Sequence, residues 1–252
     1  MDVFNRPYIK QLAVVLLISV SVVSCASNDD KDPPSMVSPL TLPPDQNSVL
    51  STAATAMGEV ETATFTIERS GAPIYIDPLE VIVFIKAEGR FEAPASADAL
   101  VSVQASGFNT QIGAIANEGK IWLSDPVTGK FSSSAESYAF NPITLFDPTI
   151  GWRPLLESGL TEIEWIGLDH SRTEERYRLK GRAEPDRIEV ITGGLVRDEE
   201  VILELWLDTK TGVVREAEFS TTYEGATSFW KLAFNGYGKP VEISPPPTTN
   251  SG

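Results

Sequence analysis

The residue of this chain with the clearest chemistry is its single cysteine, Cys25. It follows closely on a short apolar run, residues 12–23, which comes after the positive charges of Arg6 and Lys10. The run is too short for a bilayer, which needs about 20 apolar residues, but it is typical of a signal peptide. The four residues up to Cys25 read Val-Val-Ser-Cys, the form of a lipobox. We expect a lipoprotein signal peptide over residues 1–24 and acylation, for example with palmitate, at Cys25; an ordinary secretory signal with an incidental cysteine is the alternative.

Acylation of Cys25 would decide where the protein resides. Attached acyl chains contribute about 0.8 kcal/mol per buried CH₂, and two or more chains anchor a protein stably. We therefore expect the membrane to be a partner through this anchor, which would hold the protein on the extracytoplasmic face of the cell membrane. With the thiol consumed, stability has to come from a hydrophobic core and not from disulfides.

The other polar residues show no pattern typical of catalysis. The single histidine, His170, lies in Leu-Asp-His-Ser, and side chains adjacent in sequence cannot form a nucleophile–base–orienter triad with one another. One histidine and one cysteine leave no ligand set for zinc, and Gly129-Lys130 lacks the upstream glycine of a phosphate loop. Carboxylate pairs such as Glu199-Glu200 are most simply solvated. We expect no enzyme, no catalytic residue, no metal and no cofactor; a carboxylate-only hydrolase is the weak alternative.

The charge of the chain argues against two classes of partner. The formal net charge is −15 over the full sequence, and removal of residues 1–24 would change it to −16. A protein this acidic is a poor nucleic-acid binder, because phosphate contacts need Lys and Arg. It would also be repelled from anionic lipid surfaces. Solubility alone is a sufficient reason for the acidity.

Composition divides the chain into four parts. After the signal peptide, residues 25–47 are rich in Pro, Ser and Asp and are expected to form a flexible tether behind the acylated cysteine. Residues 244–252 have the same character and are expected to be a disordered tail. Residues 48–243, about 200 in number, are enough for one domain with a sizeable core or cavity.

The folded part is expected to be α+β and mainly β. A short helix is predicted at residues 48–58, with Ser48 as its N-cap, and others at 152–159 and 185–194. Strand patterns occur at residues 60–69, 79–91, 99–108, 110–117, 120–124, 161–166, 176–182, 199–207, 213–221 and 227–237. About ten strands with short connections predict one large antiparallel sheet with a few helices.

Two of the predicted hairpin turns have the same chemistry. Residues 125–129 read Asp-Pro-Val-Thr-Gly, and residues 208–212 read Asp-Thr-Lys-Thr-Gly. An aspartate that opens a turn and a glycine with positive φ are favoured by turn geometry alone. We prefer that explanation to an internal duplication, which would also account for the pair.

Several strands are apolar on both faces, which is unusual for an antiparallel sheet with one wet face. In residues 201–207, Val, Leu, Leu and Leu oppose Ile202 and Trp206, and Phe229 opposes Trp230. Such a sheet has to be covered twice, yet the predicted helices are few and short. Either the sheet curves onto itself or one face lines an apolar cavity; a plain two-layer core with some exposed aromatics is the alternative.

Four segments resemble the LppX/LprAFG family of bacterial cell-envelope lipoproteins. They are Leu-Phe-Asp-Pro-Thr-Ile-Gly-Trp-Arg-Pro-Leu-Leu at 145–156, Tyr-Arg-Leu-Lys-Gly-Arg at 177–182, Leu-Trp-Leu-Asp-Thr-Lys-Thr-Gly-Val-Val-Arg at 205–215 and Asn-Gly-Tyr-Gly-Lys-Pro-Val-Glu-Ile at 235–243. The resemblance implies a curved half-barrel sheet capped by helices, with an apolar cavity between them. It implies a carrier that binds acylated lipid or glycolipid and assists its transfer across the envelope, with an envelope transporter as a further partner.

The family offers no catalytic motif to carry over, so the cavity residues follow from the predicted elements. We expect residues 79–91 to form a wall and residues 145–156 a cap, with a cavity above the usual pocket range of about 300–1,000 Å³. The candidate lining residues are Phe65, Ile67, Val83, Phe84, Ile85, Leu145, Phe146, Leu155, Leu156, Leu203 and Leu205.

A second hypothesis places no lipid in the protein. The same curved sheet could dock or sense an envelope protein, with Trp152, Trp165, Trp206 and Trp230 as hot spots, because tryptophan is enriched there. Burial in the core is the simpler interpretation of each of these residues.

Overall fold

The computed structural model describes residues 44–77, 79–133, 140–170 and 174–246. In chain order the elements are α1 (Gln46–Gly58), β1 (Thr62–Gly71), β2 (Ile82–Glu92), β3 (Ser96–Ala105), β4 (Phe108–Asn117), β5 (Lys120–Ser124), β6 (Phe131–Ser133), the 3₁₀ helix η1 (Pro142–Leu145), α2 (Trp152–Ser158), β7 (Leu160–Asp169), β8 (Arg176–Ala183), α3 (Pro185–Ile191), β9 (Val201–Asp208), β10 (Val214–Tyr223) and β11 (Ala226–Asn235). No helix in these described ranges is long and apolar enough to span a membrane.

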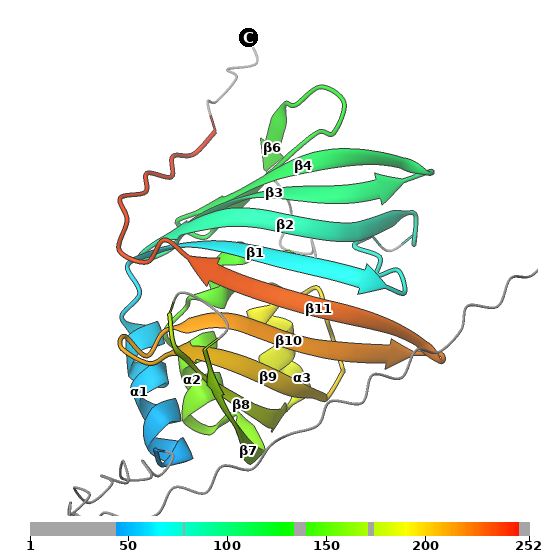
Figure 1. Ribbon diagram of the computed structural model, residues 1–252. Coiled ribbons are helices and arrows are strands. Elements are labelled where there is room, and N and C mark those ends of the chain that lie inside the picture. The colour runs from blue at the N-terminus through cyan, green and yellow to red at the C-terminus, as the bar shows by residue number, and fades with distance from the viewer. Residues whose placement is uncertain (1–43, 78, 134–139, 171–173, 247–252) are drawn as a thin grey trace, which may run out of the picture. The chain divides into compact units, whose positions relative to one another are not determined.

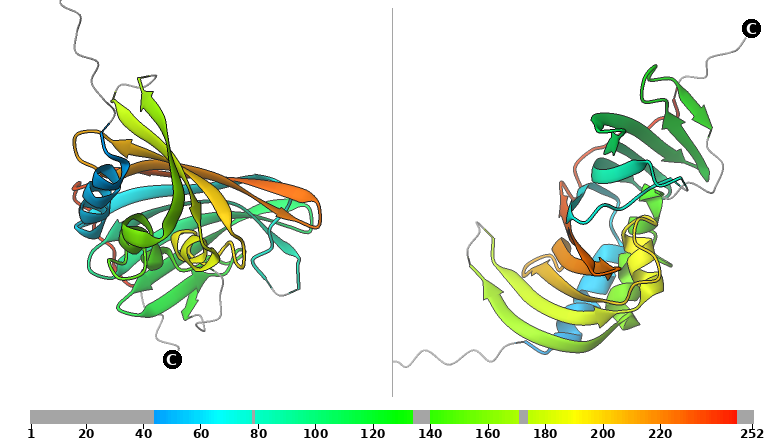
Figure 2. Two further views of the ribbon diagram at one scale, coloured as in Figure 1. Left: turned by 90° about the horizontal axis from the view of Figure 1, so that it is seen from below. Right: turned by 90° about the vertical axis from the view of Figure 1, so that its right-hand side faces the viewer.

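All the strands belong to one open antiparallel sheet. Its order is β6-β5-β4-β3-β2-β1-β11-β10-β9-β8-β7, so the last strand, β11, pairs with the first, β1. Strands that follow one another in the chain pair within each half, with α3 between β8 and β9, and the β1–β11 pair joins the two halves. The sheet is strongly twisted, and the helices lie together on one side of it (Figures 1 and 2). The expected fold class, a large curved sheet of half-barrel type with a few capping helices, is confirmed.

The core lies between the concave face of the sheet and these helices. On β1, Ala63, Phe65 and Ile67 are buried, while the threonines between them point to the other face. Gly89, opposite Phe65 on β2, is needed for this packing, because an added Cβ would lie 2.3 Å from the Phe65 ring. The alternation of burial along each strand therefore positions one apolar face against the helices.

No second layer of the described residues covers the convex face (Figure 2). Ion pairs lie on it both between and along strands, such as Lys86 of β2 with Glu68 of β1 and with Glu88 of β2, each at 3.0 Å. Apolar residues on this face remain in contact with solvent: Ile202 is 49% and Phe229 57% exposed. The expectation that both apolar faces must be covered is therefore wrong, since exposed apolar side chains are tolerated between charged ones.

Three local features differ from the sequence predictions. Helix α1 begins at Gln46, because the Asp45 carboxylate accepts a hydrogen bond from the Ser48 N–H at 2.9 Å; Asp45, and not Ser48, is the N-cap. The short strand β6 and the 3₁₀ helix η1 were not predicted. A bulge between Phe84 and Lys86 shifts the register of β2 against β3.

The two Asp-x-x-x-Gly turns have the geometry that their chemistry predicts. In each, the glycine N–H donates to the aspartate carbonyl at 2.9 Å. The glycines Gly129 and Gly212 have φ of 69° and 78°, which other residues rarely adopt. Turn geometry is therefore sufficient to account for both sequences.

Candidate functional site

The interior between sheet and helices is built from aromatic rings. Phe146, which follows η1, stacks on Phe91 at 4.7 Å between ring centroids and meets Phe234 edge-on at 5.6 Å. Trp152 at the start of α2 contacts the same Phe234 at 5.3 Å. Offset and edge-to-face pairs of this kind stabilise beyond simple area burial. Residues 145–156 thus pack against the sheet, where the cap was expected.

A second aromatic stack lies further along the concave face. Trp230 on β11 is placed between Phe84 on β2 and Phe219 on β10, with both centroid distances 5.9 Å. Its indole N–H donates to the Thr221 hydroxyl at 3.3 Å. The stack therefore joins strands from both halves of the sheet across the β1–β11 pair.

An apolar pocket of about 70 Å³ remains under the β2–β5 half of the sheet. Its lining residues come from the end of the β1–β2 loop, from β2 to β5, and from the segment before η1; they are Ile76, Asp77, Ile82, Val101, Ile112, Ala114, Leu123 and Phe140. The pocket is apolar, as expected, but it is far smaller than a typical ligand pocket. The aromatic rings and η1 fill the space in which a wide cavity was expected.

The eleven candidate lining residues fall into two groups. Nine of them are buried in the core that faces the helices and pack between sheet and helices: Phe65, Ile67, Phe84, Leu145, Phe146, Leu155, Leu156, Leu203 and Leu205. Val83 and Ile85 are only half-buried. Ile85 is the extra residue of the β2 bulge and lines a groove on the convex face. None of the eleven lines the apolar pocket, and their role in lipid binding stays a prediction.

The convex face has wider hollows of a different character. One groove of about 640 Å³ runs over β1, β2 and β8–β11, and another of about 590 Å³ lies over β1–β4. The first is lined by paired charges such as Lys231, which bonds Glu218 at 2.8 Å and also Glu216. Apolar side chains such as Ile85, Ile202 and Phe229 also line this groove, so its lining is mixed, unlike that of the apolar pocket.

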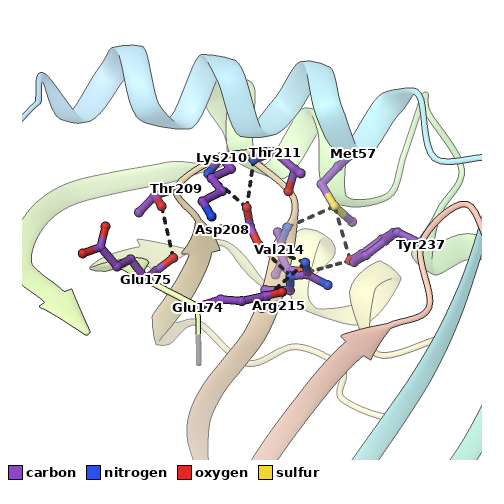
Figure 3. Close-up of polar contacts among 10 residues, drawn as sticks. All are labelled: Met57, Glu174, Glu175, Asp208, Thr209, Lys210, Thr211, Val214, Arg215 and Tyr237. Atoms are coloured by element: carbon purple, nitrogen blue, oxygen red, sulfur yellow. Dashed lines mark hydrogen bonds and ion pairs between the residues drawn. The ribbon is translucent and has the colours of Figure 1, made fainter. Parts of the chain in front are cut away.

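A buried polar cluster locks the β9–β10 turn beneath α1 (Figure 3). Asp208 accepts the N–H groups of Lys210 and Thr211 at 3.0 and 2.8 Å, and the Arg215 Nη2 donates to it at 2.9 Å. Burial raises the pKa of the Asp208 carboxyl, but these hydrogen bonds outweigh burial and bring the pKa to about 2. The cluster is a stabilising one, with no arrangement of nucleophile and base.

Tyr237 joins the same cluster from the segment after β11. Its hydroxyl donates to the Val214 carbonyl at 2.5 Å, and the Arg215 guanidinium lies over its ring at 5.5 Å. Burial raises the pKa of the Tyr237 hydroxyl well above its usual range. Met57 of α1 accepts the Val214 N–H at 3.3 Å, which ties the helix to this turn.

His170 lies at the surface, as a turn residue would. Its Nδ1 is 3.3 Å from a Glu175 carboxylate oxygen, and the side chain is largely exposed. Among the residues that the structure describes, no group of His, Cys, Asp and Glu is placed to hold a metal ion. Cys25 lies outside the described residues.

The sequence profile described as LppX_LprAFG lipoprotein matches residues 45–243, which is the whole of the sheet and its helices. The chain belongs to the LppX/LprAFG lipoprotein family. No curated protein matches the chain by sequence.

Solved structures of this LppX/LprAFG type agree with the fold. LprF from Mycobacterium bovis superposes with a TM-score of 0.61 at 12% identity, over 81% of this chain and 98% of LprF. LppX from Mycobacterium tuberculosis gives a TM-score of 0.55 at 11% identity, over 79% of this chain and 98% of LppX. At such low identity these likenesses show the common sheet and its helices.

Proposed function

We propose that this LppX/LprAFG lipoprotein is an envelope lipid carrier. In this proposal it is held by an acylated Cys25 on the extracytoplasmic face of the cell membrane, binds acylated lipid between its sheet and helices, and assists lipid transfer across the envelope. The observation that carries the proposal is the pocket under β2–β5. Its lining is almost entirely apolar, and it lies inside the fold of a lipoprotein family.

Lipid entry requires the interior to open. The pocket of about 70 Å³ is too small for a ligand of several acyl chains, since ligand pockets usually have about 300–1,000 Å³. In this proposal the segment from Phe140 to Phe146 moves, because Phe140 closes the pocket and the Phe146 ring fills the adjoining interior against Phe91. Displacement of this segment would join the pocket to the space now filled by Phe146.

The pocket can be filled from its own wall. Ala114 on β4 is buried and lines the pocket, so Ala114→Leu places extra methyl groups in the space an acyl chain would enter. We expect this variant to fold and to bind a fluorescent long-chain acyl probe at least tenfold more weakly, because about two buried CH₂ groups are lost to the ligand. Gln111→Leu, on the exposed face of the same strand, is the control and should bind as the wild type does. Equal binding by all three proteins would contradict a cargo site at this pocket.

The docking hypothesis loses most of its proposed anchors. Trp152, Trp206 and Trp230 are between 1% and 6% exposed, which leaves them nothing to offer a partner protein. Trp165 is half-buried and packs against Tyr177 at 5.3 Å. These four tryptophans therefore offer no exposed surface for a transporter. They offer none for a sensing role without cargo either.

A further inference from the structure

The most exposed apolar side chains of the described residues are all found at one edge of the sheet. Edge here means a side on which the strands end in turns and loops, and not an outermost strand. Val127 is 90%, Leu79 80% and Phe108 77% exposed, and Tyr223, Phe229 and Val81 follow at 71, 57 and 54%. These six side chains are here called the apolar rim. Because large apolar patches on a monomer usually mark an interaction surface, their common position needs an explanation.

The sheet register brings these residues to the same edge. The β1–β2 loop, the β3–β4 turn and the β10–β11 turn lie at the right of Figure 1, and the β5–β6 turn, at the same end of the antiparallel strands, lies at its top. Each of these four connections carries or adjoins at least one member of the apolar rim. At the opposite edge, residues 93–95, 118–119 and 209–213 have no exposed large apolar side chain, and Leu168, which adjoins the β7–β8 connection, is 46% exposed, less than any member of the apolar rim.

Two aspartates satisfy the backbone of the loop tips. Asp77 accepts the N–H groups of Leu79 at 3.1 Å and Val81 at 3.0 Å. Asp125 accepts that of Val127 at 3.0 Å. In both loops a carboxylate thus accepts backbone N–H groups of the tip, while an apolar side chain points into solvent. A tip whose N–H groups are already paired can leave water without the cost of an unsatisfied donor.

The apolar rim also borders the pocket. Ile76, Asp77 and Ile82 line the pocket, and they belong to or adjoin the loop that presents Leu79 and Val81. The loop is closed at its base by the Ile76 N–H, which donates to the Ile82 carbonyl at 3.0 Å. A binding partner that contacts the apolar side chains of this loop would therefore lie at one end of the apolar interior.

We propose that the apolar rim inserts into the interfacial region of a zwitterionic or neutral lipid surface. A hollow of about 520 Å³ separates the β1–β2 loop from the β10–β11 turn, and its lining includes the charged side chains of Glu80, Arg197 and Glu224. The apolar tips therefore stand apart on separate loops, and the Cys25 anchor of the proposed function would hold them within reach of a lipid surface. The net charge of −15 and the presence of Glu80 and Glu224 among the tips disfavour an anionic lipid surface. The proposal uses the Cys25 anchor of the proposed function, but it does not depend on a lipid cargo.

Single labels can locate the contact in the acylated protein. Cys25 is the only cysteine, so once it is acylated a new cysteine is a unique labelling site. Leu79→Cys, Phe108→Cys and Val127→Cys would each carry a polarity-sensitive dye, in protein held on phosphatidylcholine vesicles that contain a spin-labelled quencher lipid. Lys120→Cys and Lys210→Cys, exposed at the opposite edge, are the matched controls.

We expect several-fold stronger quenching at the three rim labels than at the two controls. Adding Leu79→Asp and Val127→Asp should abolish the quenching of a label at position 108. Equal quenching at both edges, no quenching at either, or quenching that survives the two aspartates would each overturn the proposal.

Flotation with the vesicles reports the anchor separately from the rim. If the protein does not float with the vesicles, the acyl anchor at Cys25 is contradicted. If the dyes at the rim positions then also show no change in fluorescence when vesicles are added, the rim proposal is contradicted as well. A lipid cargo detected in protein whose rim labels stay unquenched would leave the carrier function standing and the rim proposal refuted.

Discussion

At the scale of single residues, two aspartates with the same turn geometry differ in burial and therefore in their expected contribution to stability. Asp125 and Asp208 open turns of the same geometry, and hydrogen bonds from their own turn lower the pKa of both carboxyls. Asp125 is at the surface, whereas Asp208 is 5% exposed and also receives the Arg215 guanidinium. Because a buried carboxylate depends on its partners, only Asp208 should contribute strongly to stability.

Replacing Asp208 should reveal this contribution as a pH effect. A carboxyl with a pKa of about 2 when folded and its ordinary value when unfolded stabilises the fold above about pH 5 and loses this stabilisation as the pH falls toward 2. We expect Asp208→Asn to lower the free energy of unfolding at pH 7 by roughly 2 kcal/mol, and by about half as much at pH 3. Urea unfolding of both proteins at the two pH values measures it.

Asp125→Asn is the matched control for that substitution. Its turn has the same sequence pattern, but its carboxylate faces solvent and has no arginine partner within the described residues. A loss of stability equal to that of Asp208→Asn would mean that the turn alone, and not the buried ion pair, supplies the effect.

The sequence predicted which residues are buried more accurately than it predicted which of them line a cavity. Val83 and Ile85 were expected to line the cavity together with Phe84, but they flank this buried residue, both are only half-buried, and Ile85 lines the convex groove. Phe146 was expected to line a cavity, whereas its ring fills the space against Phe91. A bulge and a ring rotamer depend on tertiary contacts that no local pattern encodes.

At the scale of elements, the N-terminus of α1 shows which of two possible residues caps the helix. Asp45 and Ser48 are both good N-cap residues, and the sequence alone favoured Ser48. In the structure Ser48 lies in the first turn, and its N–H is the donor to the Asp45 carboxylate. The helix therefore begins two residues earlier, which adds Gln46 beside β7.

The cap assignment can be checked by two alanines. Asp45→Ala removes the acceptor for the Ser48 N–H and should lower the free energy of unfolding by about 1 kcal/mol. Ser48→Ala keeps that hydrogen bond and should cost clearly less. Thermal or urea unfolding of the pair decides between them, and the reverse order of losses would restore Ser48 as the cap.

Among the elements, the longer strands were predictable and the shortest ones were not. Ten strands and three helices have clear periodic or capping signals, and each is present, β5 with the predicted bounds and the others with shifted ends. Strand β6 has three residues and pairs only with β5, so its sequence carries no period. The 3₁₀ helix η1 is held by Asn141, whose side chain accepts the Ile143 N–H at 3.2 Å.

At the scale of the whole described unit, pairing of the first strand with the last decides the architecture. The β1–β11 pair joins two hairpin series into one sheet, and one set of helices then covers its concave face. Strand patterns predicted such a sheet but could not predict the strand order, because pairing between distant segments leaves no local signal. The small pocket likewise results from how completely η1 and the aromatic rings fill the interior.

The central claim is that the interior of this lipoprotein binds acylated lipid. Native mass spectrometry of the protein purified from the cells that produce it, followed by lipid extraction, tests it most directly. We predict discrete added masses that resolve into acylated lipids, lost in Ala114→Leu and retained in Gln111→Leu. A mass that shows the protein alone, also after incubation with an envelope lipid extract, would contradict the carrier function.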